Sequence, residues 1–244
     1  AGVVGAPSIP FNQTLSVFFD GSDDYMTTTL STQIFSGDFT LSFWGRPVAS
    51  SHAYCTVMQL GGYSGGFRLY RYPPVIAGTA GRFAWWKGAV GSGYNSIFGN
   101  FGSSAADTWF NMTIIRSGTA MTAYLNGSQV ATQDNSHSAQ SYTSTAWDIS
   151  FTQYPYDGRI DELALWDSAL STSDISALYS SKGDARFLSP NNYWRMGDGT
   201  GDTDSGGGTP ASGDTVGTIV DQGDDGNNLV GSNGNPPLFS DIVP

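Results

Sequence analysis

Carboxylates are the first residues to weigh, because pairs of them hydrolyse glycosidic bonds. The chain has 21 acidic residues, and Glu162 is the only glutamate among them. Glycoside hydrolysis uses two carboxyl groups about 5–10 Å apart, and Glu162 has no glutamate to pair with. Asp161 is its neighbour in an expected strand, so their side chains should point to opposite faces. A pair formed with a distant aspartate is the catalytic alternative, but the pattern favours a protein that is not an enzyme.

Nucleophile and zinc chemistry also lack their usual residues. Cys55 is the only cysteine, which leaves no intrachain disulfide and no thiolate cluster for zinc. It lies in an apolar stretch, so we expect a buried structural thiol. His52 and His137, the only histidines, have no metal-ligand spacing to each other, and no nucleophile elbow with a strand-to-helix context is present.

Aromatic side chains are the residues most suited to sugar binding, because flat rings offer apolar faces to pyranose rings. Several lie in or near expected loops. Burial is the usual fate of large aromatic residues, so we expect at least half of them to pack against the protein instead. The carbohydrate-binding candidates are Tyr63, Trp85, Trp86, Tyr94, Tyr154 and Tyr156.

The charge of the chain limits its partners. The formal net charge is −11 and the isoelectric point is near 4.2. Nucleic-acid binding requires a basic surface, so it is not expected. The sequence contains no run of 18 apolar residues, so membrane insertion is not expected. The first residues show no signal-peptide pattern. The acidic balance fits either solubility or calcium bound in acidic loops.

The elements that would position these residues are mostly strands. The composition is rich in glycine and aromatic residues and poor in charge, which indicates an all-β protein. Apolar residues alternate with polar ones in residues 39–44, as in a half-buried strand. Residues 109–132 predict strands joined by a type I′ turn at Asn126-Gly127. Further strands are expected at 15–19, 54–60, 67–72 and 159–166.

One helix is predicted after the strand at 159–166. Ser171 is a suitable N-cap, and Asp174 stands three residues later, where a capping-box acid belongs. Leu170 should pack on Ile175 as a hydrophobic staple, and Gly183 should end the segment.

Four blocks, in the right order, resemble the laminin-G-like (concanavalin A-like) jelly-roll family. The resemblance implies a two-sheet antiparallel jelly-roll sandwich with one short helix and a long, loop-rich C-terminal arm. It also implies a structural calcium site at Asp20 and Asp161, which Asp23 and Asp24 could join; the alternative is that these carboxylates only accept turn hydrogen bonds. The blocks are 15–25 (LSVFFDGSDDY), 39–44 (FTLSFW), 109–127 and 157–175.

The order of the motifs resembles a permuted member of this family. A segment that commonly precedes the first strand is instead found after the helix, at residues 193–199 (YWRMGDG) and 220–229 (VDQGDDGNNL). We therefore expect an N-terminal arm at 1–13, a jelly roll at 14–187 and a Gly/Asp-rich arm at 188–244. That last arm would complete its own sandwich, dock on a neighbouring copy, or be a truncated second repeat.

The permuted layout also resembles laminin-G-like virion proteins of bacteriophages. This resemblance implies a non-enzymatic virion structural protein, such as a decoration, fibre or tail component. Its arms would bind other virion or self subunits as a homo-oligomer, at a virion surface or in an extracellular setting. The alternative function is a calcium-dependent carbohydrate-binding module or lectin, and a virion protein that binds glycans would combine both.

Overall fold

A computed structural model describes residues 12–31, 33–49, 54–61, 66–72, 81–87, 95–134, 144–232 and 234–244. For residues 86, 87, 95–101, 133 and 134 it describes the backbone only. Two of the candidate residues, Tyr63 and Tyr94, lie outside the described residues.

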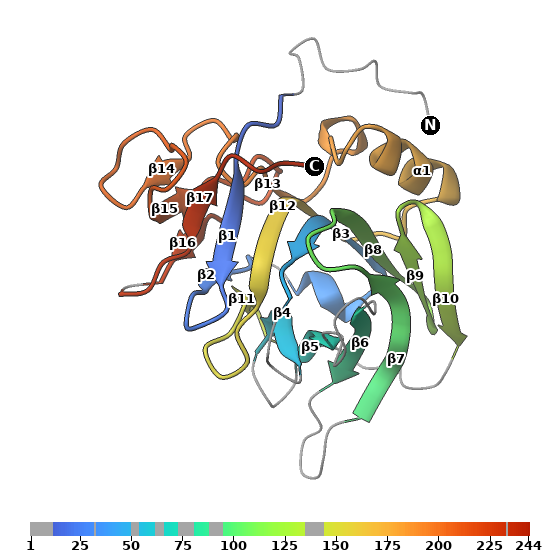
Figure 1. The fold of residues 1–244 in the computed structure, drawn as a ribbon. Coiled ribbons are helices and arrows are strands. Elements are labelled where there is room, and N and C mark those ends of the chain that lie inside the picture. Colours follow the sequence, from blue (N-terminus) through green and yellow to red (C-terminus); the bar gives the residue numbers. More distant parts are fainter. Residues whose placement is uncertain are drawn as a thin grey trace.

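Two antiparallel sheets face each other (Figure 1). The first has the order β10-β9-β8-β3-β12-β1-β17, with β13 also paired to β12. Its strands are β1 (Ser16–Asp20), β3 (Phe39–Pro47), β8 (Phe110–Ser117), β9 (Ala120–Leu125), β10 (Ser128–Asp134), β12 (Asp157–Trp166), β13 (Asn192–Trp194) and β17 (Leu238–Ser240).

The second sheet has nine strands in the order β14-β15-β16-β2-β11-β4-β5-β6-β7. Its strands are β2 (Met26–Thr29), β4 (Cys55–Leu60), β5 (Phe67–Tyr72), β6 (Gly81–Lys87), β7 (Asn95–Ser104), β11 (Ala146–Ile149), β14 (Thr203–Asp204), β15 (Val216–Ile219) and β16 (Leu229–Gly231). The all-β, two-sheet jelly roll expected from the sequence is confirmed.

The core lies between the sheets and follows the period of two in the sequence. Phe39, Leu41 and Phe43 of β3 are fully buried in it, as the alternation predicted. The opposing sheet contributes rings such as Trp85 and Trp147. Burying each such side chain contributes roughly 1.5–3 kcal/mol, so this layer supplies most of the driving force for folding.

The hairpin of β9 and β10 confirms the expected turn. Asn126 and Gly127 have φ angles of 52° and 73°. A two-residue type I′ turn requires positive φ at both positions, which Asn and Gly adopt at the lowest cost. The turn fixes the register in which Leu125 pairs with Ser128.

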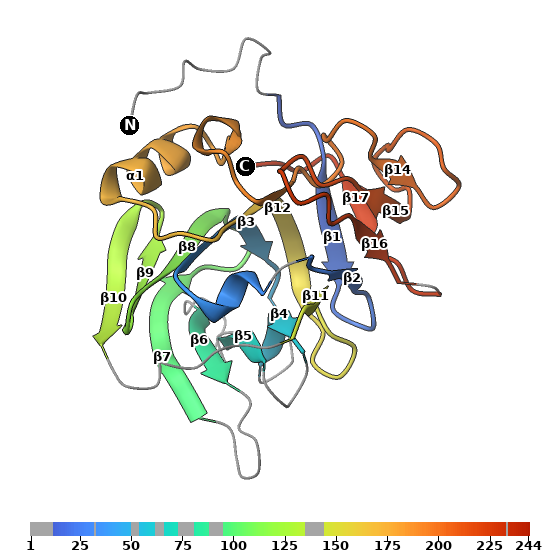
Figure 2. The same cartoon turned by 180° about the vertical axis from the view of Figure 1, so that it is seen from behind.

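The helix α1 (Thr172–Ser180) begins as predicted. The Ser171 hydroxyl accepts a hydrogen bond from the Asp174 backbone N–H, and the Asp174 carboxylate accepts one from the Ser171 backbone N–H. Ile175 packs with Ile115, Tyr124 and Leu170. The helix therefore covers the outer face of the eight-stranded sheet, as Figures 1 and 2 show from opposite sides. No helix among the described residues has the length and apolar character of a membrane span.

Residues 188–244 add strands to both sheets of their own chain. β13 pairs with β12, β16 with β2, and β17 with β1. Apolar residues of this segment, including Trp194, Ile219 and Phe239, belong to the same core cluster as those of the jelly roll. Because one core serves both parts, the segment is an integral part of the sandwich in this structure.

Candidate functional site

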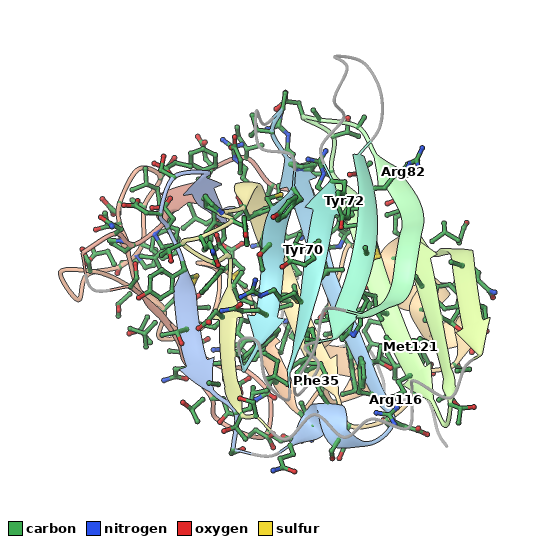
Figure 3. All side chains as sticks on the ribbon, turned by 90° about the horizontal axis from the view of Figure 1, so that it is seen from below. Phe35, Tyr70, Tyr72, Arg82, Arg116 and Met121 are labelled. Atoms are coloured by element: carbon green, nitrogen blue, oxygen red, sulfur yellow. The ribbon has the colours of Figure 1, made fainter. Side chains whose placement is uncertain are left out.

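Four tyrosines gather at the outer face of the nine-stranded sheet, the face that α1 does not cover. We call Tyr54, Tyr70, Tyr72 and Tyr154 the tyrosine cluster. Tyr54 lies at its centre, with ring centroids 4.6 Å from Tyr154, 5.5 Å from Tyr70 and 6.1 Å from Tyr72. Figure 3 looks onto this sheet and labels Tyr70 and Tyr72 on β5, with Arg82 beside them.

The alternation of β5 explains why these rings face outward. Phe67 and Leu69 point into the core and are fully buried, so Arg68, Tyr70 and Tyr72 point to the opposite face. Tyr154 comes from the loop after β11, where its carbonyl accepts a hydrogen bond of 2.7 Å from the Thr56 N–H. A rigid strand and a pinned loop thus present the cluster.

A hydrogen-bonded row runs across the sheet next to the cluster. Asp148, Gln59 and Arg68 stand opposite one another on β11, β4 and β5. The Gln59 Nε2 donates to the Asp148 carboxylate at 2.7 Å, and the Arg68 Nε donates to Gln59 Oε1 at 2.8 Å. The Arg68 Nη1 donates to the Tyr70 hydroxyl at 3.0 Å, and its guanidinium lies 4.7 Å from the centre of the Phe151 ring. We call these four residues, Asp148, Gln59, Arg68 and Tyr70, the polar row.

The cluster and the row form a buried floor with a half-buried rim. Arg68 is only 3% exposed, and Gln59 and Tyr70 are also buried, whereas Tyr54, Tyr72 and Tyr154 are half-buried. The hydrogen bond with Tyr154, together with burial, raises the pKa of Tyr54 to about 12. The Tyr54 phenol therefore stays neutral at physiological pH, and each tyrosine of the cluster offers both an apolar ring and a hydrogen-bonding hydroxyl.

Only part of the predicted sugar site is accessible. Tyr154 belongs to the tyrosine cluster. Trp85 and Tyr156 are both 0% exposed, so the prediction that they bind sugar is wrong: Trp85 stacks on Phe67 in the core, and Tyr156 packs on Phe19. Trp86 follows on β6, opposite Arg68, where only the backbone is described.

Tyr54, Tyr70, Tyr72 and Arg68 were missed by the sequence analysis. The signal was present in residues 67–72 (FRLYRY), where a period of two places one arginine and two tyrosines on a single face. The sugar-binding candidates were aromatic residues in or near expected loops, and this choice excluded the tyrosines of β5. The outward face of a central strand supplied the residues instead.

A cluster of carboxylates lies in the turn between β1 and β2. The carboxylates of Asp20, Asp23 and Asp24 have oxygens within 4.8 Å of one another. Asp24 is buried, and this burial raises its pKa to about 6, helped by the charges of Asp20 and Asp23. Each carboxylate also accepts a hydrogen bond: Asp20 from the Ser22 N–H, Asp24 from the Asp20 N–H and Asp23 from Asn235.

Asp161 does not belong with that turn, which corrects the predicted metal site. Asp20 pairs with Asp157, and Asp161 is four residues further along β12, about 13 Å away at the rise of a strand. Asp161 is fully buried opposite Trp44. It therefore lies in the interior and not among the acidic residues of the turn.

The expectation that Asp161 and Glu162 point to opposite faces of the strand is also wrong, because the residues on either side of the pair, Ile160 and Leu163, both point into the core. A bulge interrupts the register of β12 at this point, and Glu162 has a φ of 46°. Both carboxyl groups are buried as a result, with Glu162 only 1% exposed. Desolvation raises the pKa of Asp161 well above its usual range and that of Glu162 to about 8. The pair keeps at least one proton at neutral pH.

Glu162 is held by residues of the C-terminal segment. It accepts hydrogen bonds from the Tyr193 hydroxyl and, at 3.4 Å, from the Arg195 Nε. Arg195 also donates to the carbonyls of Asn12 and Asp198. We call Asp161, Glu162, Tyr193 and Arg195 the carboxylate lock. Its carboxylates are sealed from solvent and are thus unavailable to a substrate, while its arginine ties Asn12 to the C-terminal segment.

Known proteins share this architecture at low sequence identity. The chain is similar to a candidate carbohydrate-binding protein from Bacteroides ovatus, with a TM-score of 0.60, 15% identity, and coverage of 95% of this chain and 63% of that one. It is similar to a heptameric SAP-like pentraxin from Limulus polyphemus, with a TM-score of 0.53, 17% identity, and coverage of 72% and 86%. It also resembles the CBM40 module of the Ruminococcus gnavus IT-sialidase, solved with α2,3-sialyllactose, with a TM-score of 0.50, 13% identity, and coverage of 69% and 100%.

These structural likenesses establish the sandwich fold. No curated protein sequence matches the chain. A family profile described as the concanavalin A-like lectin/glucanases superfamily, of the laminin G type, matches residues 20–176. The match spans β2 through most of α1 and covers more than half of the chain. The protein therefore belongs to the laminin G-type family of the concanavalin A-like lectin/glucanases superfamily.

Proposed function

We propose that this protein is a non-catalytic carbohydrate-binding module whose sugar site is the tyrosine cluster. The observation that carries the proposal is the group of half-buried tyrosine rings on the open sheet face, backed by a satisfied polar row. Sugar rings bind through apolar contact with aromatic faces and hydrogen bonds from fixed polar groups. The carboxylate lock offers no accessible catalytic pair, so binding without hydrolysis is the activity that the described residues support.

Names of structurally similar proteins support this proposal by precedent. The R. gnavus module was solved with sialyllactose, and the B. ovatus protein is a candidate carbohydrate-binding protein. Their shared fold with this chain provides a scaffold on which sugar binding is known, and the tyrosine cluster provides the local chemistry.

The test is glycan binding by the wild type and by a Tyr72→Ala/Tyr154→Ala double variant. A broad glycan array identifies ligands, and titration calorimetry measures their affinity. Losing two aromatic contacts should weaken binding by tenfold or more, since each contact is worth on the order of 1 kcal/mol. A Tyr179→Ala variant serves as a control, because Tyr179 lies on α1 against Trp44, at the other sheet.

The outcomes separate binding from folding. The double variant should keep the wild-type circular dichroism and unfolding midpoint to within a few degrees. A blank array, or a double variant that binds like the wild type, would refute the proposal.

We propose in addition that calcium occupies the acidic turn as a structural ion. Three neighbouring carboxylates offer the hard oxygen ligands that this ion prefers. With a Kd of about 10⁻⁴–10⁻³ M, millimolar calcium would add roughly 1 kcal/mol of stability. Thermal unfolding with calcium and with EDTA tests this, and Asp23→Asn should abolish the difference. Equal midpoints in both buffers would show that hydrogen bonds alone organise the turn.

The virion role stays a prediction from sequence resemblance. It relied on terminal arms that bind neighbouring subunits, yet residues 188–244 pair within their own chain here. The phage origin, the homo-oligomer and the extracellular or virion-surface setting likewise stay predictions. Light scattering of the purified protein tests the oligomer directly.

A further inference from the structure

The charges of the chain are segregated along its sequence. Residues 39–106 contain none of the 21 acidic residues but five of the ten cationic ones. This stretch includes β4, β5, β6 and β7, which form one half of the nine-stranded sheet. The half of the sheet that holds Tyr54, Tyr70 and Tyr72 is thus cationic, within a protein whose net charge is −11.

Arg82 brings one of these charges to the surface beside the tyrosine cluster. The register of β5 and β6 places Tyr72 directly opposite Arg82. Arg82 is the only one of the eight arginines whose side chain is exposed, and none of the described residues forms an ion pair with it. Figure 3 shows Arg82 next to Tyr72 at the end of the two strands. A free guanidinium beside a tyrosine ring is suited to bind a carboxylate while the ring holds a sugar.

Two further arginines lie beneath this point. Arg68 is buried under the face, and the only carboxylate in its row, Asp148, reaches it through Gln59. Arg71 is fully buried, and its Nη1 and Nη2 have no hydrogen-bond partner in the described part of the chain. Buried positive charge in a low-dielectric interior raises the potential at the nearby surface.

We infer that the tyrosine cluster selects acidic saccharides, with Arg82 binding the acid group of a sugar that rests on Tyr72. The inference rests on the proposed function and names its ligand class, namely sugars that carry a carboxylate or a sulfate. Asp148 lies on β11 at the far end of the polar row, three strands from β6, which carries Arg82, so it does not oppose the acid group. The acidic C-terminal segment forms the opposite edge of the sheet, at β14, β15 and β16. Its negative charges therefore lie away from the half that carries Arg82.

The experiment compares acidic glycans with their neutral counterparts. Uronate, sialylated and sulfated oligosaccharides are arrayed beside carboxyl-reduced, desialylated and desulfated forms, in 50 mM and 500 mM salt. We expect at least one acidic glycan to bind about tenfold more tightly than its neutral form, with the difference shrinking at high salt. The three acidic series distinguish carboxylate from sulfate recognition.

Matched variants locate the effect. Arg82→Gln should weaken binding of the acidic glycan on the order of tenfold and leave the neutral form unchanged. Lys182→Gln removes the same charge from an exposed residue beyond α1 and should change neither. If acidic and neutral forms bind equally while Tyr72→Ala/Tyr154→Ala loses both, the acidic preference is refuted and the sugar site stands. If no glycan binds at all, both the proposed sugar site and the proposed preference for acidic sugars are refuted.

Discussion

The polar row and the carboxylate lock are two buried networks with one arginine each, placed on opposite sheets. In the lock, Arg195 donates to the buried Glu162 carboxyl group and to the backbone carbonyls of Asn12 and Asp198. In the row, Arg68 meets one amide and one phenol, and half-buried tyrosines surround it. The lock holds two buried carboxyl groups for one arginine and is closed to solvent, whereas the row holds one carboxylate for one arginine and borders half-buried tyrosines.

This difference separates stability from recognition. A closed network contributes to the fold because its groups are satisfied internally and cannot exchange partners with a ligand. A network that borders half-buried, accessible side chains can exchange hydrogen-bond partners with a ligand. We therefore expect changes in the lock to alter unfolding and changes in the row to alter binding.

The largest effect is expected at the lock. Glu162→Ala removes the acceptor of both Tyr193 and Arg195 and leaves a cavity, so it should lower the free energy of unfolding by about 3–5 kcal/mol. Urea unfolding measures this loss. Glu162→Gln, which keeps the volume and an acceptor, is the matched control and should lose much less. A loss below 1 kcal/mol for the alanine variant would mean that the lock does not stabilise the fold.

The next effect is the pH dependence that the lock imposes. Glu162 titrates near its usual value of 4.5 in the unfolded chain and at about 8 in the folded one. Between these values the folded state holds more protons, so stability from this group is greatest below about pH 4.5 and falls as pH rises to about 8. The loss by pH 8 should be of the order of 4 kcal/mol.

Unfolding free energies of the wild type and of Glu162→Gln, measured from pH 5 to 8, isolate this contribution from that of surface aspartates. The two curves should diverge as the pH rises. Parallel curves would contradict the raised pKa and show that Glu162 ionises normally when buried.

The smallest effect on stability is expected in the row. Arg68→Met removes two hydrogen bonds donated by a charged guanidinium and should cost about 1–3 kcal/mol. Glycan binding should fall more than tenfold, because Tyr70 loses the hydrogen bond from Arg68 and the face loses a cation. Chemical unfolding and calorimetry on the same preparation compare the two losses. A variant that is strongly destabilised but binds normally would reverse the roles assigned to the networks.

The sequence predicted the elements better than the site. Alternation, the Asn126-Gly127 turn and the Ser171 cap are local signals, and each is confirmed. The tyrosine cluster combines residues from β4, β5 and the loop after β11, so it exists only once the strands pair. Trp85 was misplaced because an apolar residue near loop-like sequence looked exposed, although its strand turns it inward.

The lock escaped prediction for a related reason. Strict alternation sends Asp161 and Glu162 to opposite faces, and no local signal in the sequence marks the bulge that buries both. Its partners Tyr193 and Arg195 lie some thirty residues away in a segment whose composition resembles a flexible tail. Only the pairing of β13 with β12 brings them together.

The position of β1 between β12 and β17 has a consequence for how the molecule is made. Ser16, near the start of the chain, pairs with Ser240, near its end. During synthesis, the edge of β1 that pairs with β17 therefore stays unpaired until residue 240 has left the ribosome. Contacts of such long sequence separation slow folding and expose strand edges to other nascent chains. This sandwich should accordingly complete its folding only after residue 240 has emerged, and its yield should improve when synthesis is slowed by low temperature.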